Sequence, residues 1–220
     1  PGLIKDISYG GIGLTLSDIP KDMEIPVEWQ GRLTILDQTI DCPATKAHET
    51  RDENNNVFVG LSLRHETTDT LVFLRDVIEN LCNGRSLEQL DRAVLSEPYN
   101  TSDWVCLRGD GPTDLRVKLS SQQSLEEFIL TYRSGGMYQE LTWRDGVIRT
   151  GTALNQLGPS AKMDYSPRPM PSVIRQAIYI VMALPNEDLF SKCGPVIEAS
   201  LNELSVLAGD TSNTTDEGAA

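Results

Sequence analysis

Histidine, cysteine and positive charge are all scarce in this sequence of 220 residues. Only two histidines and four cysteines are present, and 19 lysines and arginines oppose 32 aspartates and glutamates, for a net charge of -13. This charge argues against nonspecific binding to nucleic acid or to membrane surfaces, because phosphate backbones and anionic lipids would be repelled. No DNA or RNA partner is expected, although a local cluster of arginines could still hold a small anion.

The four cysteines (Cys42, Cys82, Cys106 and Cys193) lie far apart in the sequence. They form no Cys-x-x-Cys pair and have no nearby histidine, so no zinc site is expected. Their low density does not suggest a disulfide framework, so reduced thiols and a cytoplasmic location are expected. The longest apolar stretch, VIRQAIYIVMALP, is too short to span a bilayer and contains Arg175, so no membrane segment is expected.

The first part of the chain, to about Leu63, has the pattern of a small antiparallel β-barrel. Short segments with alternating apolar residues are separated by the breaks SDIPKD, QG and ETRDENNN. Strands are predicted at residues 11–16, 25–29, 33–40 and 57–63. Apolar residues at helical spacing then predict a helix over 67–82, with cap candidates at 67–69 and Gly84 as its stop. A capping box at Ser86 predicts a second short helix.

The rest of the chain has the pattern of an α+β unit. Residues 104–119 predict two strands around a Gly-Asp-Gly-Pro turn, and residues 140–152 predict a hairpin that turns at Asp145-Gly146. A capping box at Ser124 predicts a helix that runs through Tyr132 and ends at Gly135-Gly136. Two C-terminal helices are predicted, at residues 172–184 and 195–207.

These elements predict a mainly β first unit followed by an α+β unit. We expect a barrel with its helix at residues 1–85, a connecting helix and linker at 86–102, an α+β unit at 103–208 and a disordered tail at 209–220.

Signals for catalysis are weak throughout the chain, and no enzyme is expected. His48 and His65 have no nucleophile or metal ligand at a useful spacing, so each is expected to be a surface or strand-end residue. Neither glycine pair, GGIG or SGGM, is followed by the lysine of a P-loop. The aromatic residues of the second unit are expected in its core: Trp104, Tyr138, Trp143, Tyr165 and Tyr179. Its arginines could gather into an anion site, but their scatter among acidic residues favours isolated surface charges: Arg108, Arg116, Arg133, Arg144 and Arg149.

The stretch DISYGG near the start gives a stronger signal for a site than the rest of the chain, because its residues together suit one ligand. Asp6 and Ser8 are two residues apart, so in an extended chain both side chains point to the same face. An ionised carboxylate only accepts hydrogen bonds, and therefore suits two adjacent donors such as the N1–H and amino group of guanine. Gly11 lacks a Cβ, and would let the backbone turn sharply or a flat ligand approach. The alternative is a simple turn, with Asp and Ser as caps and glycines at positive φ, and spacing alone does not decide between the two.

Asp6, Ser8 and Gly11, followed by an alternating strand, resemble the D/N-x-S-x-x-G signature of PilZ domains. The order of the polar loop, the strands, the segment VFVGLSL and the helix is similar too, so the resemblance covers roughly residues 1–85. It implies a small antiparallel β-barrel that binds cyclic di-GMP, with these three residues on one side of a guanine. It also implies an R-x-x-x-R motif before Asp6, whose arginines bind phosphates and guanine edges. That motif and the first barrel strand are missing from a sequence that begins at Pro1, so a truncated chain is expected.

The resemblance implies a regulatory protein of bacterial second-messenger signalling. Cyclic di-GMP would bind to the PilZ-like domain, and the second unit would relay the change to a protein partner that the sequence does not identify. Two alternatives stay open: a degenerate PilZ-like domain that scaffolds protein contacts without a nucleotide, and the regulatory tail of a larger polysaccharide synthase.

Overall fold

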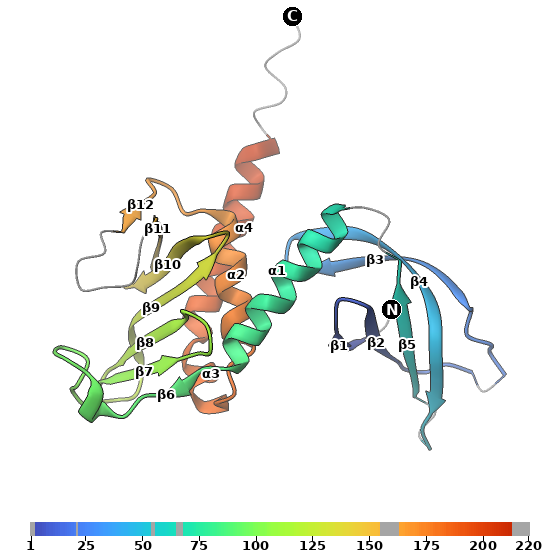
Figure 1. The fold of residues 1–220 in the computed structure, drawn as a ribbon, viewed down its shortest axis with the longest axis horizontal. Coiled ribbons are helices and arrows are strands. Elements are labelled where there is room, and N and C mark those ends of the chain that lie inside the picture. Colours follow the sequence, from blue (N-terminus) through green and yellow to red (C-terminus); the bar gives the residue numbers. More distant parts are fainter. Residues whose placement is uncertain (1–2, 21, 54–55, 65–67, 155–162, 213–220) are drawn as a thin grey trace, which may run out of the picture. The chain divides into compact units, whose positions relative to one another are not determined.

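The computed structural model describes residues 3–20, 22–53, 56–64, 68–154 and 163–212 (Figure 1). The chain divides into two compact units, Pro1–Glu79 and Asn80–Ala220. Helix α1 (Thr68–Arg85) contributes to both. The predicted fold class is confirmed: a curled antiparallel sheet is followed by a helix and then by an α+β unit.

The first unit contains a five-stranded antiparallel sheet in the order β1-β2-β5-β4-β3. Its strands are β1 (Leu3–Ile7), β2 (Gly11–Leu16), β3 (Glu28–Ile35), β4 (Gln38–Arg51) and β5 (Val57–Leu63). Strands β1 and β3 each pair on one side only, so the sheet is a half-barrel and not a closed barrel. Because side chains alternate along a strand, Ile12, Ala44 and Val59 are buried on the inner face while their neighbours face outward.

Two of the four strands predicted in this sheet, 11–16 and 57–63, are confirmed residue for residue. The strand predicted at 25–29 is wrong, because β3 begins only at Glu28. The strand predicted at 33–40 is wrong, because the chain reverses in its middle. Leu36, with a φ of 55°, lies in that turn. The apolar alternation continues across the turn and leucine is not a typical turn residue, so Asp37 alone marks the reversal in the sequence. Gln30-Gly31, expected as a break, lies inside β3, and β4 extends through Arg51 into the expected polar loop.

The second unit contains a seven-stranded antiparallel sheet in which strands consecutive in sequence are neighbours. The strands are β6 (Glu88–Gln89), β7 (Trp104–Arg108), β8 (Asp114–Leu119), β9 (Leu125–Ser134), β10 (Met137–Arg144), β11 (Val147–Ala153) and β12 (Asp164–Tyr165). Helices α2 (Pro171–Met182), α3 (Glu187–Lys192) and α4 (Gly194–Ser212) follow. Helix α2 contacts β10 and α4 contacts β11, so helices cover one face of the sheet (Figure 1). Tyr132 is fully buried on that face, and its hydroxyl donates to the Val173 carbonyl at 3.1 Å.

The helix predicted from Ser124 through Tyr132 is wrong, because these residues form β9. Phe128, Leu130 and Tyr132 are all fully buried, and this period of two outweighs the capping box. Gly135 and Gly136, with φ of 59° and 85°, form the hairpin turn into β10 and do not end a helix.

The short helix predicted at Ser86 is also wrong. The Ser86 hydroxyl donates to the Asn83 carbonyl at 2.9 Å, at the end of α1, and the chain continues as β6 and a 3-10 turn, Arg92–Val94. Helix α1 is confirmed, but it continues through Gly84 to Arg85. Of the other residues named above, Thr67 and His65 lie outside the described residues.

The other strands and helices predicted in the second unit are confirmed. The two strands around the Gly-Asp-Gly-Pro turn are β7 and β8, the hairpin turns at Asp145-Gly146, and two long helices close the fold. Helix α3 was not predicted from the sequence. Helix α4 continues through Ser212, so residues 209–212 of the expected disordered tail are helical, while residues 213–220 lie outside the described part of the chain.

At Gly84, α1 lies very close to α2, and no other described glycine of the second unit has so little room for a side chain. A Cβ at Gly84 would lie 2.0 Å from the Ile180 carbonyl oxygen and 3.0 Å from the Ala183 Cβ. Since a backbone carbonyl cannot swing away, any side chain here would push the two helices apart.

Replacing Gly84 with alanine is therefore expected to destabilise the protein by about 1–3 kcal/mol. Within an unobstructed helix the same replacement would stabilise by about 1 kcal/mol. Urea unfolding followed by circular dichroism measures the difference. The matched control is Gly209→Ala in α4, where nothing lies within 4 Å of an added Cβ, and its stability should hold or rise. A Gly84→Ala variant as stable as the parent would contradict the contact.

Candidate functional site

The residues of the D-x-S-x-x-G pattern lie at the hairpin that joins β1 to β2. Asp6 belongs to β1, and Gly11 begins β2. Ser8 lies between the strands: its N–H donates to the Gly11 carbonyl at 2.8 Å, and its hydroxyl accepts from the Gly11 N–H at 3.1 Å. The Ser8 side chain therefore closes the turn, and the extended conformation assumed for both residues holds for Asp6 alone.

Gly11 is required by packing and not by its backbone angle. A Cβ at Gly11 would lie 2.6 Å from the Leu61 carbonyl oxygen of β5. The expectation of positive φ is wrong for Gly10 and Gly11, because neither is among the described glycines with positive φ. The missing side chain of Gly11 lets β5 pair closely with β2.

Asp6 lies at one end of a row of four residues across the outer face of the half-barrel. In this row Asp6 pairs with Gly13 of β2, Gly13 pairs with Gly60 of β5, and Gly60 pairs with His48 of β4. The two strands at the ends of this row, β1 and β4, each have a bulge immediately before the row residue. Each bulge adds one residue to its strand, so Asp6 and His48 face outward, away from the buried inner face. We call these four residues the outer row.

The two central glycines of the outer row make room for the two side chains at its ends. A Cβ at Gly13 would lie 2.3 Å from Asp6 Oδ2, and a Cβ at Gly60 would lie 2.0 Å from His48 Cε1. Positions paired directly in antiparallel strands have Cβ atoms about 5 Å apart. The carboxylate and the imidazole therefore lean toward one another over the glycine pair. Both residues are exposed, and no ion pair joins them in the described part of the chain.

This arrangement can hold the polar edge of one flat ring. The carboxylate accepts two hydrogen bonds, while the imidazole offers an N–H donor and an aromatic face. The sequence predicts a surface or strand-end position for His48. It is a surface residue, but it lies within β4 and opposite Asp6. The signal that could have found it is the pair of glycines inside two strands, Gly13 and Gly60, which becomes informative only when the pairing of those strands is known.

An ion network on the other face of β4 stabilises the strand that carries His48. Lys46 Nζ donates to Glu49 Oε2 at 3.0 Å and to the Ile25 carbonyl at 2.8 Å, and Arg51 Nε donates to Glu49 Oε1 at 3.3 Å. Arg51 also donates to the Pro20 carbonyl at 3.1 Å. The hydrogen bond from Lys46, with the attraction of both cations, lowers the pKa of Glu49. The network thus joins the segment between β2 and β3 to β4.

Acid is expected to weaken this network. Because the pKa of Glu49 is lowered from 4.5 in the folded chain, its stabilising effect is complete above that pH and is lost as the pH falls through the folded pKa. The difference in stability between the parent and Glu49→Gln should therefore be largest at neutral pH and should shrink below about pH 4.5. Urea unfolding at a series of pH values measures it. A difference independent of pH would show that the Glu49 charge does not act through the network.

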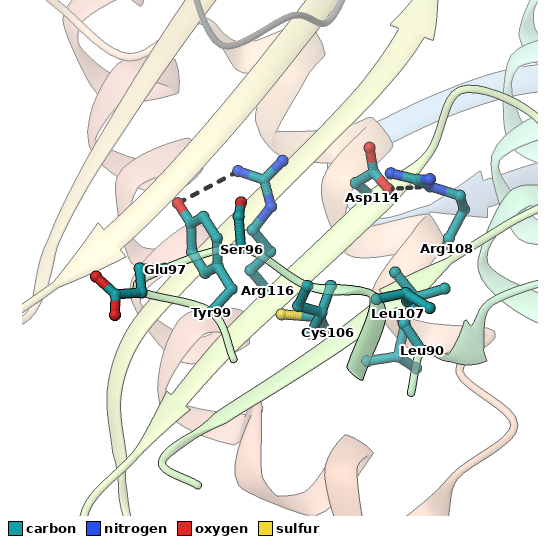
Figure 2. A pocket seen from close by; sticks show the side chains of 11 residues that line it. Leu90, Ser96, Glu97, Tyr99, Cys106, Leu107, Arg108, Asp114 and Arg116 are labelled. Atoms are coloured by element: carbon teal, nitrogen blue, oxygen red, sulfur yellow. Dashed lines mark hydrogen bonds and ion pairs between the residues drawn. The ribbon is translucent and has the colours of Figure 1, made fainter. Parts of the chain in front are cut away.

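The second unit carries two clefts on the face of its sheet that the helices leave open. One, of about 580 Å³, is lined by Cys106, Arg108, Asp114 and Arg116 under Tyr99 (Figure 2). In it, Arg108 Nε donates to Asp114 Oδ1 at 2.8 Å, and this hydrogen bond raises the pKa of Arg108. The other, of about 620 Å³, shares Tyr99 and Arg116 and extends across β9–β12.

Part of the prediction for this unit is wrong. Arg144 and Arg149 are exposed surface charges, as expected, but they line one cleft together with Arg116, whereas Arg133 does not line it. Tyr165, expected in the core, is 46% exposed and also lines the cleft. The aromatic residues confirmed as buried are Trp104, Trp143 and Tyr179.

A scan against protein-family models, a search of curated proteins and a search of solved structures found no match for this chain. Among the described residues, no cluster of three His, Cys, Asp or Glu side chains could hold a metal ion. None of the described helices is both long enough and apolar enough to cross a membrane.

The structural role of Gly11 can be separated from any role in binding. Gly11→Ala is expected to destabilise the first unit by about 1–3 kcal/mol, because the added methyl group meets the Leu61 carbonyl. Gly10→Ala is the matched control, since nothing lies within 4 Å of its added Cβ. Thermal unfolding compares the two. Equal stability of both variants would contradict the close pairing of β2 with β5.

Proposed function

We propose that the outer row is a guanine-binding site and that the protein is an effector of cyclic di-GMP. One observation carries the proposal: the exposed Asp6 carboxylate, within the D-x-S-x-x-G pattern, leans toward the His48 imidazole over a pair of glycines. The proposed role is binding and regulation, not catalysis.

The chemistry of the two side chains favours guanine over adenine. The Asp6 carboxylate accepts from the N1–H and the amino group of guanine, and His48 donates to O6 or N7 on the neighbouring edge. Adenine presents an acceptor at N1, which would face the carboxylate and leave two acceptors opposed. A site built to accept hydrogen bonds discriminates strongly against a ring that lacks the donors.

Cations near the outer row support binding of the phosphates. Lys5, next to Asp6, is exposed. Arg64 lies over the adjacent row of the same face, where it donates to Thr45 Oγ1 at 3.1 Å and to Glu28 at 2.6 Å. The side chains of Arg64 and Glu28 are 51% and 57% exposed, so their ion pair contributes little stability and can open for a phosphate. The arginine segment implied by the resemblance would add to these two cations.

The relay to the second unit would pass through α1, the element that both compact units share. A nucleotide can shift the protein between two arrangements only if its contacts differ between them. The nucleotide would contact the segments on either side of the outer row, including α1, and these contacts would differ between the two arrangements of the protein. The proposed output is a protein partner of the second unit.

Calorimetric titration of cyclic di-GMP tests the proposal. The sample is the chain of residues 1–220 and, in parallel, the same chain with any residues that precede Pro1 in its gene. Asp6→Ala should weaken binding by about 1.5–3 kcal/mol, roughly ten- to a hundredfold in Kd, because charge-assisted hydrogen bonds are lost. His48→Ala should also weaken it, by roughly tenfold.

The matched control is Asp41→Ala, an exposed carboxylate seven residues before His48 on the same strand, and it should leave the affinity unchanged. Cyclic di-AMP should bind at least tenfold more weakly than cyclic di-GMP. Absence of heat from folded samples of both lengths would reject nucleotide binding and favour a protein-interaction scaffold. Binding that Asp6→Ala and His48→Ala leave intact would move the site away from the outer row.

A further inference from the structure

The open face of the second sheet carries an ordered row of side chains beneath the larger cleft. The row runs from Arg116 on β8 through Ile129 on β9 and Thr142 on β10 to Arg149 on β11. The cleft above it, of about 620 Å³, has a size typical of small-molecule sites. All of its lining residues belong to the second unit, so it is separate from the outer row of the first.

Within the described part of the chain, neither arginine at the ends of this row has a carboxylate partner. Arg149 is exposed and makes no hydrogen bond or ion pair with the described residues. Arg116 contacts Tyr99 instead of an acid: its guanidinium carbon lies 4.8 Å from the ring centroid, and Nη1 donates to the hydroxyl at 3.4 Å (Figure 2). Arg108, another cation of this face, is paired with Asp114. The positive charge of Arg116 and Arg149 is thus available to a ligand.

The acidic residues of the cleft are already engaged. Glu140 accepts from Thr131 Oγ1 at 3.0 Å and also from the Tyr165 hydroxyl. Partial burial and this hydrogen bond raise the pKa of Tyr165, so its hydroxyl stays protonated. Asp145 lies beside Arg144 at 3.8 Å. Glu127 lies opposite Lys118 and Arg144 in the strand register, and the charge of Lys118 attracts it. Three arginines line the cleft and balance its three acidic residues. An anion can therefore enter the cleft despite the net charge of -13.

The floor and walls of the cleft suit a flat ring. Ile129 and Thr142, between the two arginines, are half-buried and offer an apolar surface with one hydroxyl. Tyr99 and Tyr165 both line the cleft, and aromatic faces stack on planar ligands. Three strand spacings, about 14 Å, separate the backbones of the two arginines. Arginine side chains span part of that width, and the gap between them fits a ring with an attached anionic group.

We propose that this cleft binds an aromatic organic anion, a flat ring that carries a phosphate or carboxylate group. Arg149 binds the oxyanion, for which the planar guanidinium offers two parallel donors. The ring lies over Ile129 and Thr142 and extends toward the Arg116–Tyr99 pair, where cation–π and stacking contacts are available. The inference is independent of nucleotide binding by the outer row.

Calorimetric titration of the full chain with four probes tests it. AMP combines a ring with a phosphate, indole-3-acetate combines a ring with a carboxylate, adenosine has the ring alone, and orthophosphate has the anion alone. At least one of the first two is expected to bind with a Kd below about 1 mM, at least tenfold more tightly than adenosine or orthophosphate. Which of the two binds more tightly distinguishes a phosphate from a carboxylate ligand.

Arg149→Gln is the decisive variant, because this exposed side chain makes no hydrogen bond or ion pair with the described residues on which folding would depend. This substitution should raise the Kd of the probe that binds at least tenfold. Arg133→Gln, an exposed arginine of β9 outside the cleft, is the matched control and should have no effect. Asp6→Ala should also have none, which separates this site from the outer row. Failure of both aromatic anions to bind, equal binding of adenosine or orthophosphate, or binding that survives Arg149→Gln would overturn the proposal.

Discussion

The close approach of β2 and β5 is the constraint on which the first unit depends. Gly11 allows it, because any side chain there would meet the Leu61 carbonyl. The same two strands then present Gly13 and Gly60 as direct partners on the outer face. Glycine in a strand interior ordinarily weakens the strand, so Gly13 and Gly60 inside two short paired strands indicate positions at which a side chain would be obstructed. The space they leave is filled by Asp6 and His48, which are 42 residues apart in the sequence.

The two faces of the sheet in the second unit differ: one packs against helices, and the other is open and carries polar residues. Alternation along β9 buries Phe128, Leu130 and Tyr132 against the helices and leaves Glu127, Ile129 and Thr131 on the opposite face. Because α2 and α4 cover the first face, the second face can carry polar and charged residues. Among the described residues, two hydroxyl groups donate to Glu140, while Arg116 and Arg149 have no acidic partner, and the proposed anion site rests on these two arginines.

Local patterns in the sequence predicted the fold class and several elements. Val57–Leu63, Asp145-Gly146 and helix α1 each carry a signal that needs no partner strand. The errors arose where two local rules conflicted or where tertiary pairing decided. At Ser124 a capping box masked a strand, and at Leu36-Asp37 a turn formed with one typical turn residue, Asp37. The candidate site was predicted only in part, since Asp6 follows from the pattern near the start, whereas His48 depends on two bulges and on the pairing of four strands.

Binding of a single ligand by Asp6 and His48 together is tested most directly by NMR spectra of the full chain during titration with cyclic di-GMP. The amide resonances of Gly13 and Gly60 and the imidazole resonances of His48 should shift together and saturate at the same ligand concentration. The same shifts should be lost in the Asp6→Ala variant while the rest of the spectrum shows a folded chain. Shifts confined to residues 80–220, or an unchanged His48 ring at saturating ligand, would contradict a shared site on the outer row.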